Sequence, residues 1–174
     1  MVIWITGITA SGKTSIGTNL HKSLITQGRY SSKHIDGDML RRRKDWVSGH
    51  SIESRKVALK KIVDVCLEEQ KSADIVIVST VSHLISMRKY ARSKLEKFHE
   101  IFLDVGPDIC AMRDYKKLYE KAFNNEFSCF PGVTEEYQKY DEFDLALSTG
   151  VESLETCSKV LLSYVQKQIL IANN

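Results

Sequence analysis

A glycine-rich segment near the N-terminus constrains the fold of this chain more than any other feature. Residues 7–14 read Gly-Ile-Thr-Ala-Ser-Gly-Lys-Thr and match the pattern G-x-x-x-x-G-K-[ST] at every fixed position. An apolar run at Val2–Thr6 precedes the segment, and apolar residues at helical spacing follow it. Glycines let such a loop turn tightly, so that its backbone N–H groups converge on an anion at the positive end of the next helix. The arrangement predicts a strand, a phosphate-binding loop and a helix.

The same motif assigns chemistry to individual residues. Lys13 is expected to reach the β- and γ-phosphates of a nucleotide, and Thr14 to place its hydroxyl on Mg²⁺. The loop itself is expected to complete the ATP site, with contacts from Gly7, Ala10, Ser11, Gly12 and Ser15. We therefore predict ATP as the nucleotide and Mg²⁺ as the cofactor.

Short strand-like runs alternate with longer helical patterns along the chain. The runs lie at Val2–Thr6, around His34–Ile35, and at Ile75–Ser79, Ile101–Val105 and Leu145–Leu147. Helical spacing follows Lys13, with Gly28 placed to cap the helix, and recurs in two apolar stripes expected in the core: Leu59, Ile62, Val63, Cys66 and Leu67, then Leu154, Val160, Leu161, Val165 and Ile169. This alternation predicts one α/β domain over residues 1–174, with a five-stranded parallel sheet flanked by helices in three layers.

Composition excludes several other classes of protein. Of the 174 residues, 43% are hydrophobic and 27% are charged, a composition that indicates a globular rather than a disordered chain. The formal net charge of +3 is too small to indicate a nucleic-acid or membrane surface. Aliphatic runs such as 75–78 stay far below the ~20 residues of a membrane span. The four cysteines lack metal-ligand spacing, so we expect reduced, half-buried thiols in a soluble, cytoplasmic protein.

A second polar segment follows the second predicted strand. It reads Asp36-Gly37-Asp38-Met39-Leu40-Arg41 and falls where parallel sheets present ligand groups, at the carboxyl ends of strands. Phosphoryl transfer needs a carboxylate to orient the nucleophile or accept its proton, and cations to hold phosphates. We assign these roles to Asp38 and Arg41. The alternative is a solvated Asp-Gly turn. The position of this segment at the same sheet edge as the phosphate loop favours the functional interpretation.

A basic stretch with aromatic residues occupies about residues 113–133. Arginine, lysines, Phe127, Phe130 and Pro131 lie within it. Beside a phosphate loop, such a stretch is typical of a mobile lid that brings positive charge to the phosphoryl group and excludes water. A plain solvated helix is the alternative.

Five features taken together resemble the adenylyl-sulfate kinase family. They are GITASGKT at 7–14, DGDMLR at 36–41, Arg55, SHLISMRKYAR at 82–92, and FLDVGPDICAMRDYKKLYEKA at 102–122. The resemblance covers about residues 1–150. It implies a P-loop kinase fold and transfer of the γ-phosphate of ATP to the 3′-hydroxyl of adenosine 5′-phosphosulfate, with Mg²⁺.

The resemblance also implies roles for particular residues. The catalytic group would be Asp38 with Asp36 behind it, together with Lys13. Arg113 would pack on the adenine of ATP. Acceptor binding would involve Asp38, Arg41, Arg55, Ser82, Lys116, Phe130 and His50, with the two arginines on the anionic 5′ group and Phe130 on the base.

The chain departs from the family pattern on the acceptor side. Ala58 stands where the family has asparagine, His50 where it has a stacking phenylalanine, and His83 where proline follows the serine. The lid reads Cys-Phe-Pro-Gly at 129–132 instead of Gly-Phe-Thr-Gly. Lost hydrogen bonds and a lost aromatic stack can change which base is accepted, although a histidine can still stack.

We therefore expect a phosphotransferase with an alcohol acceptor that phosphorylates the ribose 3′-hydroxyl of a small nucleotide. Adenylyl sulfate is the family's acceptor; the same reaction on cytidine diphosphoramidate, used in capsule polysaccharide biosynthesis, is the close alternative. A GTP-dependent switch would need an N-K-x-D guanine motif, which is absent from the sequence. A kinase of a non-nucleotide small molecule stays open. The expected partners are ATP, a nucleotide acceptor and a second copy of the chain, with no nucleic acid or membrane.

Overall fold

Five strands form the parallel sheet that the sequence predicts. The structure, a computed structural model, describes residues 1–44, 46, 49, 51–140 and 142–172. Its strands are β1 Val2–Thr6, β2 Ser32–Asp36, β3 Ile75–Ser79, β4 Phe98–Leu103 and β5 Leu145–Leu147. They pair in parallel in the order β2-β3-β1-β4-β5. The strand that leads into the glycine-rich loop is therefore central, and the loop emerges from the middle of the sheet edge.

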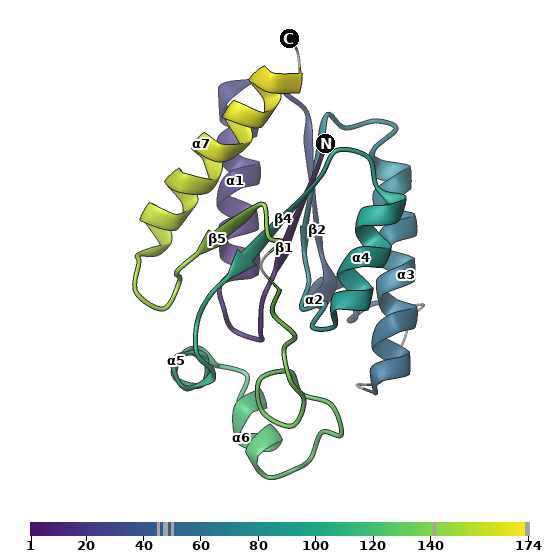
Figure 1. Ribbon diagram of the computed structural model, residues 1–174, viewed down its shortest axis with the longest axis vertical. Coiled ribbons are helices and arrows are strands. Elements are labelled where there is room, and N and C mark those ends of the chain that lie inside the picture. Colours follow the sequence, from purple (N-terminus) through teal and green to yellow (C-terminus); the bar gives the residue numbers. More distant parts are fainter. Residues whose placement is uncertain (45, 47–48, 50, 141, 173–174) are drawn as a thin grey trace.

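Helices cover both faces of this sheet (Figure 1). The helices α1, Lys13–Gln27, and α7, Leu154–Ala172, pack on one face, and α3, Ile52–Glu69, and α4, Ile85–Lys94, on the other. Alternate side chains of β1 point to opposite faces, so Ile3 and Ile5 join one buried cluster and Val2 and Trp4 the other. The two cores confirm the three-layer α/β prediction.

The predicted helix after the loop is confirmed at both ends. Gly12 and Gly28 flank α1, both in the left-handed region, with φ of 101° and 64°. The prediction that both apolar stripes lie wholly in the core is wrong at three positions: Leu67, Leu154 and Val160 are exposed. Each of them lies on the flank of its helix, turned away from the sheet that buries the other members.

The strand predicted at Ile101–Val105 is shifted toward the N-terminus. It spans Phe98–Leu103, because His99 and Glu100 belong to the strand although polar residues argue against one. Glu100 is fully buried and its Oε1 lies 2.7 Å from Nε of Arg88, so an ion pair compensates its burial. All four cysteines are free and buried, more deeply than the half-buried thiols expected.

A small lobe lies beyond the carboxyl ends of the strands (Figure 1). It contains α5, Pro107–Arg113, and α6, Leu118–Phe123, with the loop that follows; the short α2, Gly37–Leu40, comes after β2. A third buried cluster joins Ile8 of the glycine-rich loop to Tyr119 and Phe130 of this lobe. The segment predicted as a lid therefore packs on the phosphate loop. In the part of the chain that the structure describes, no helix is long and apolar enough to span a membrane.

Candidate active site

A cavity of about 520 Å³ lies at the carboxyl edge of the sheet and brings most of the predicted site residues together. Its walls come from the glycine-rich loop, α2, α3, the segment after β3, and the lid. The predicted residues that line it are Ala10, Gly12, Lys13, Thr14, Ser15, Asp36, Asp38, Arg41, Arg55, Ser82, Arg113, Lys116 and Phe130. Gly7 and Ser11 are buried behind this wall. His50 lies outside the described residues.

The glycine-rich loop closes around its own lysine. A Cβ at Gly7 would lie 2.9 Å from Oγ of Ser11, so the turn leaves no room for a side chain there. Nζ of Lys13 donates to the carbonyl of Ile8 at 2.6 Å and to Oγ of Ser11 at 3.2 Å. Burial lowers the pKa of Lys13 to about 8, and the nearby charge of Asp38 partly opposes this effect. The loop thus holds a cation at one end of the cavity.

Asp36 organises the oxygen groups next to this cation. Its buried carboxylate accepts hydrogen bonds from Thr14 Oγ1 at 2.5 Å and from the backbone N–H groups of Asp38 and Met39 at 2.8 and 3.0 Å, so it also caps α2. A hydroxyl beside a carboxylate suits Mg²⁺, which binds few protein oxygens and keeps phosphate and water ligands. Thr14, with Asp36 behind it, therefore fits this mode of binding.

Asp38 lies between the two halves of the cavity. Its carboxylate is largely exposed and lies 3.2 Å from Nζ of Lys116 in the lid. Its negative charge partly opposes the burial that lowers the pKa values of Lys13, Arg41 and Arg55. Asp38 is therefore placed to act on a group held between those cations.

Two arginines form the far end of the cavity. Arg41 donates to the carbonyl of Gly49 at 3.1 Å, and Arg55 donates to the carbonyl of Cys129 at 3.0 Å. Burial lowers the pKa values of both guanidinium groups, and the charge of Arg55 lowers the pKa of Arg41 further. Two partly buried like charges this close favour binding of an anion between them.

The lid contacts both the loop and the cavity. The hydroxyl of Tyr119 donates to the carbonyl of Thr9 at 2.9 Å, and Arg113 donates to the carbonyl of Thr149 at 2.8 Å. Phe130 is buried and stacks on Phe127 at a centroid distance of 5.6 Å. Because Phe127 and Phe130 both line the cavity, the lid supplies its aromatic wall.

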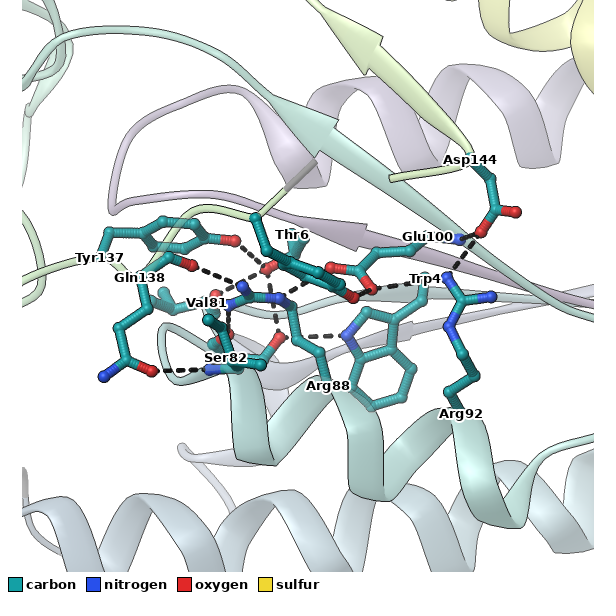
Figure 2. A network of polar contacts seen from close by, with 12 residues as sticks. Trp4, Thr6, Val81, Ser82, Arg88, Arg92, Glu100, Tyr137, Gln138 and Asp144 are labelled. Atoms are coloured by element: carbon teal, nitrogen blue, oxygen red, sulfur yellow. Dashed lines mark hydrogen bonds and ion pairs between the residues drawn. The ribbon is translucent and has the colours of Figure 1, made fainter. Parts of the chain in front are cut away.

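The side chain of Ser82 makes its hydrogen bonds to core residues. Its hydroxyl accepts a hydrogen bond from Nε1 of Trp4 at 3.0 Å and lies 3.2 Å from Oγ1 of Thr6 (Figure 2). Its φ of 35° is in the left-handed region, an uncommon conformation for a residue other than glycine. The side chain is thus turned into the core, although the residue lines the cavity.

A buried network behind this wall was not visible in the sequence (Figure 2). Arg88, fully buried, donates to the carbonyls of Ser82 at 2.8 Å and Gln138 at 2.5 Å, and its Nε faces Glu100. The hydroxyl of Tyr140 donates to the same carboxylate. The network fastens the segment after the lid to the segment after β3. A glutamate within an otherwise largely apolar strand is the sequence signal that could have indicated it.

His83 belongs to the same cavity wall, at a position where the family pattern has proline and for which the sequence predicts no role in the site. Its side chain is fully buried, and it lines the cavity as Ala58 does. Burial, followed by the charges of Arg55 and Arg88, lowers the pKa of His83 to about 4. At neutral pH this imidazole is therefore uncharged.

The lowered pKa of His83 predicts an acid-sensitive component of stability. The unfolded chain binds the proton at the ordinary pKa of about 6.5, so the free energy of unfolding falls as pH drops from about 6.5 toward 4. We expect His83 to account for about 2 kcal/mol of that loss. Urea unfolding at pH 7 and pH 4.5 measures it, and the His83→Asn protein lacks this component. Equal losses in both proteins would contradict the prediction.

Comparison with known proteins finds relatives that match most of this chain. The family model described as adenylylsulphate kinase matches residues 1–148. An adenylyl-sulfate kinase of Bacillus licheniformis is 33% identical over 169 residues, covering 96% of this chain and 85% of that protein. A probable adenylyl-sulfate kinase of Archaeoglobus fulgidus is 34% identical over 148 residues, covering 85% of this chain and 95% of that protein.

A solved structure gives the same result at the level of the fold. The APS kinase of Mycobacterium tuberculosis, in complex with AMPPNP and APS, superposes with a TM-score of 0.87 at 28% identity. The superposition covers 95% of this chain and 96% of that chain. The similarity therefore extends over the sheet, the glycine-rich loop and the lid together.

Proposed function

Because this chain belongs to the adenylylsulphate kinase family, a family of phosphotransferases with a hydroxyl acceptor, we propose that it transfers the γ-phosphoryl group of ATP to the ribose 3′-hydroxyl of adenylyl sulfate. The products are 3′-phosphoadenylyl sulfate and ADP. The observation that carries the proposal is one cavity with a phosphate loop at one end, an arginine pair at the other and Asp38 acting on both.

The donor half binds ATP through the glycine-rich loop. Its backbone N–H groups hold the phosphates, while Lys13 leaves the carbonyl of Ile8 to bind the β- and γ-phosphates. Arg113 packs on the adenine. Thr14, kept in place by Asp36, would hold Mg²⁺ with the phosphate oxygens, and the bound ion would neutralise charge that develops on the transferred group.

The acceptor half orients the nucleophile. Arg41 and Arg55 bind the anionic 5′ group, and Phe130 stacks on the base; the sequence also assigns Ser82, Lys116 and His50 to this half. Asp38 accepts a hydrogen bond from the attacking 3′-hydroxyl and takes its proton as the bond to phosphorus forms. Closure of the lid exchanges the contact between Asp38 and Lys116 for contacts with substrate and excludes water.

A second acceptor is favoured by one observation. Ala58 and His83 stand at family positions of asparagine and proline, and both line the cavity. A remodelled base site suits the same 3′-phosphorylation of a different nucleotide, such as cytidine diphosphoramidate in capsule biosynthesis. The chemistry of the donor half is identical for both acceptors. The proposal also includes that the protein acts in the cytoplasm as a homodimer.

An acceptor panel tests the proposed function. ADP release is coupled to a spectroscopic readout with nucleoside 5′-phosphosulfates, diphosphates and phosphoramidates, and ³¹P NMR locates the new phosphate. We expect ADP only when acceptor is present, with the phosphate on the 3′ position. The Lys13→Ala protein is the control, and we expect it to lose at least about a hundredfold in kcat because the transition state loses a cation. Release of ADP at equal rates with and without acceptor would contradict the proposal.

A further inference from the structure

Among the described residues of the cavity wall, one buried side-chain nitrogen has no hydrogen-bond partner. Nδ1 of His83 makes no hydrogen bond within the described residues, although the side chain is fully buried and lines the cavity. Buried polar groups in native proteins nearly always have a partner, so an unpaired one calls for an explanation. The side chain lines the cavity but its surface is covered, so a ligand in the cavity supplies that partner once a neighbouring side chain of the wall moves aside.

The other ring nitrogen already faces the protein. Nε2 of His83 lies 3.8 Å from Sγ of Cys129, whose carbonyl accepts a hydrogen bond from Arg55. A neutral imidazole has one N–H donor and one lone pair. Burial raises the pKa of the Cys129 thiol, so the thiol keeps its S–H, which the lone pair of Nε2 can accept. In this tautomer the proton resides on Nδ1.

The backbone of His83 is held rigidly. Its carbonyl accepts a hydrogen bond from the N–H of Gln138 at 3.0 Å, and the carbonyl of Ser82 accepts one from Arg88. Figure 2 shows that Ser82 is held by two donors: Arg88 bonds to its carbonyl and Nε1 of Trp4 bonds to its hydroxyl. Because the backbone at His83 is fixed, the ring keeps its place in the cavity wall, and its Nδ1–H donor is available to a ligand once the wall opens.

The cavity that His83 lines also has walls that suit the faces of a flat ring. Ala58, Leu59 and Met87 contribute apolar groups to these walls, and Phe130 contributes its aromatic ring. On the basis of the proposed function, we infer that His83 recognises the base of the acceptor nucleotide by donating its Nδ1–H to a ring nitrogen or carbonyl oxygen at the edge of that base. The replacement of the family's proline thereby becomes a determinant of base specificity.

Side-chain geometry provides the test. Asparagine places an N–H donor near the position of Nδ1, glutamine reaches instead toward the position of Nε2, and leucine has no donor. The experiment measures kcat/KM for the acceptor and KM for ATP in His83→Leu, His83→Gln and His83→Asn. We expect the leucine and glutamine proteins to lose about 10- to 100-fold in kcat/KM for the acceptor, with KM for ATP within about twofold. The asparagine protein loses several-fold less, because it keeps the donor.

Base analogues separate recognition from a merely structural effect. Deaza analogues of the acceptor that the wild type uses replace one ring nitrogen with C–H. We expect one of them, or an analogue lacking the base carbonyl, to be a poorer substrate for wild type but not for His83→Leu. His99→Asn is the matched control, since His99 is a half-buried histidine that contacts Tyr164 away from the cavity.

The outcomes distinguish a failure of base recognition by His83 from a failure of the proposed kinase function. If the leucine protein keeps its acceptor kcat/KM within twofold, or if all three variants lose equally, His83 does not recognise the base although the kinase activity stands. If the wild type uses no acceptor in the panel, the proposed function itself fails, and this inference fails with it. Should His83→Leu not fold, the difference between the asparagine and glutamine proteins gives the answer.

Discussion

Replacing Asp38 with asparagine is expected to lower kcat by about 10²- to 10⁴-fold, while KM for ATP stays within about threefold. The amide keeps the shape of the carboxylate but cannot take a proton from the attacking hydroxyl. It also removes the charge that acts on Lys13 and on the arginine pair. Steady-state kinetics with ATP and the preferred acceptor measure both parameters, and a loss in kcat alone assigns Asp38 to the chemical step.

Asp104→Asn is the matched control for the loss of one carboxylate. Like Asp38, Asp104 is exposed and paired with a lysine, Lys139 at 2.9 Å, but it does not line the cavity. We expect this protein to behave as wild type. A sharp rise in KM for ATP with an unchanged kcat in Asp38→Asn would instead place Asp38 in the nucleotide or metal site.

The Arg88→Met protein is expected to lose about 3–5 kcal/mol in its free energy of unfolding. The substitution removes the closer of the two arginines that contact the buried Glu100, leaving Arg92 at 3.6 Å, and it takes the Arg88 donor away from the carbonyls of Ser82 and Gln138. Both penalties are large, because the charged and polar groups cannot reach water. Urea unfolding at pH 7 measures the loss.

Two further variants separate the causes. Arg92→Met removes the partly exposed arginine of the same helix, which pairs with Asp144 at 2.8 Å and lies 3.6 Å from Oε2 of Glu100. Because Arg88 stays beside Glu100 in this protein, we expect a cost of only about 1 kcal/mol. Arg88→Met combined with Glu100→Leu removes both charges, so it should recover part of the loss but not the part due to the two carbonyls. A cost below about 1 kcal/mol for Arg88→Met alone would show that the buried pair contributes little.

The predictions that held were those decided by local constraints. The glycine-rich segment requires a tight turn between a strand and a helix, and Gly12 and Gly28 take the left-handed conformations that end α1. Alternation of apolar runs with helical stripes likewise predicted a parallel sheet, because each period reflects which face of an element is buried. The loop, the order of elements and the three layers could therefore be read from neighbouring residues.

The positions of strand ends and stripe edges were less predictable, since they depend on partners far away in the chain. A charged residue such as Glu100 is expected to lie outside a buried strand, but its ion pair with Arg88 allows it to be buried within β4. Leu67 and Val160 satisfy helical spacing, but they lie on flanks of their helices that face solvent, and they are exposed. Periodicity identifies a face, whereas burial depends on what covers that face.

The sequence alone determined the phosphate loop, the fold class and the identity of the charged residues at the sheet edge. Only the tertiary structure decided which of them meet: Lys116 reaches Asp38 across 78 positions, and Arg88 reaches Gln138 across 50. It also revealed the unpaired nitrogen of His83 in the cavity wall. Backbone conformation and periodicity are encoded within a few residues, whereas a site depends on contacts that form only when the sheet brings distant loops to one edge.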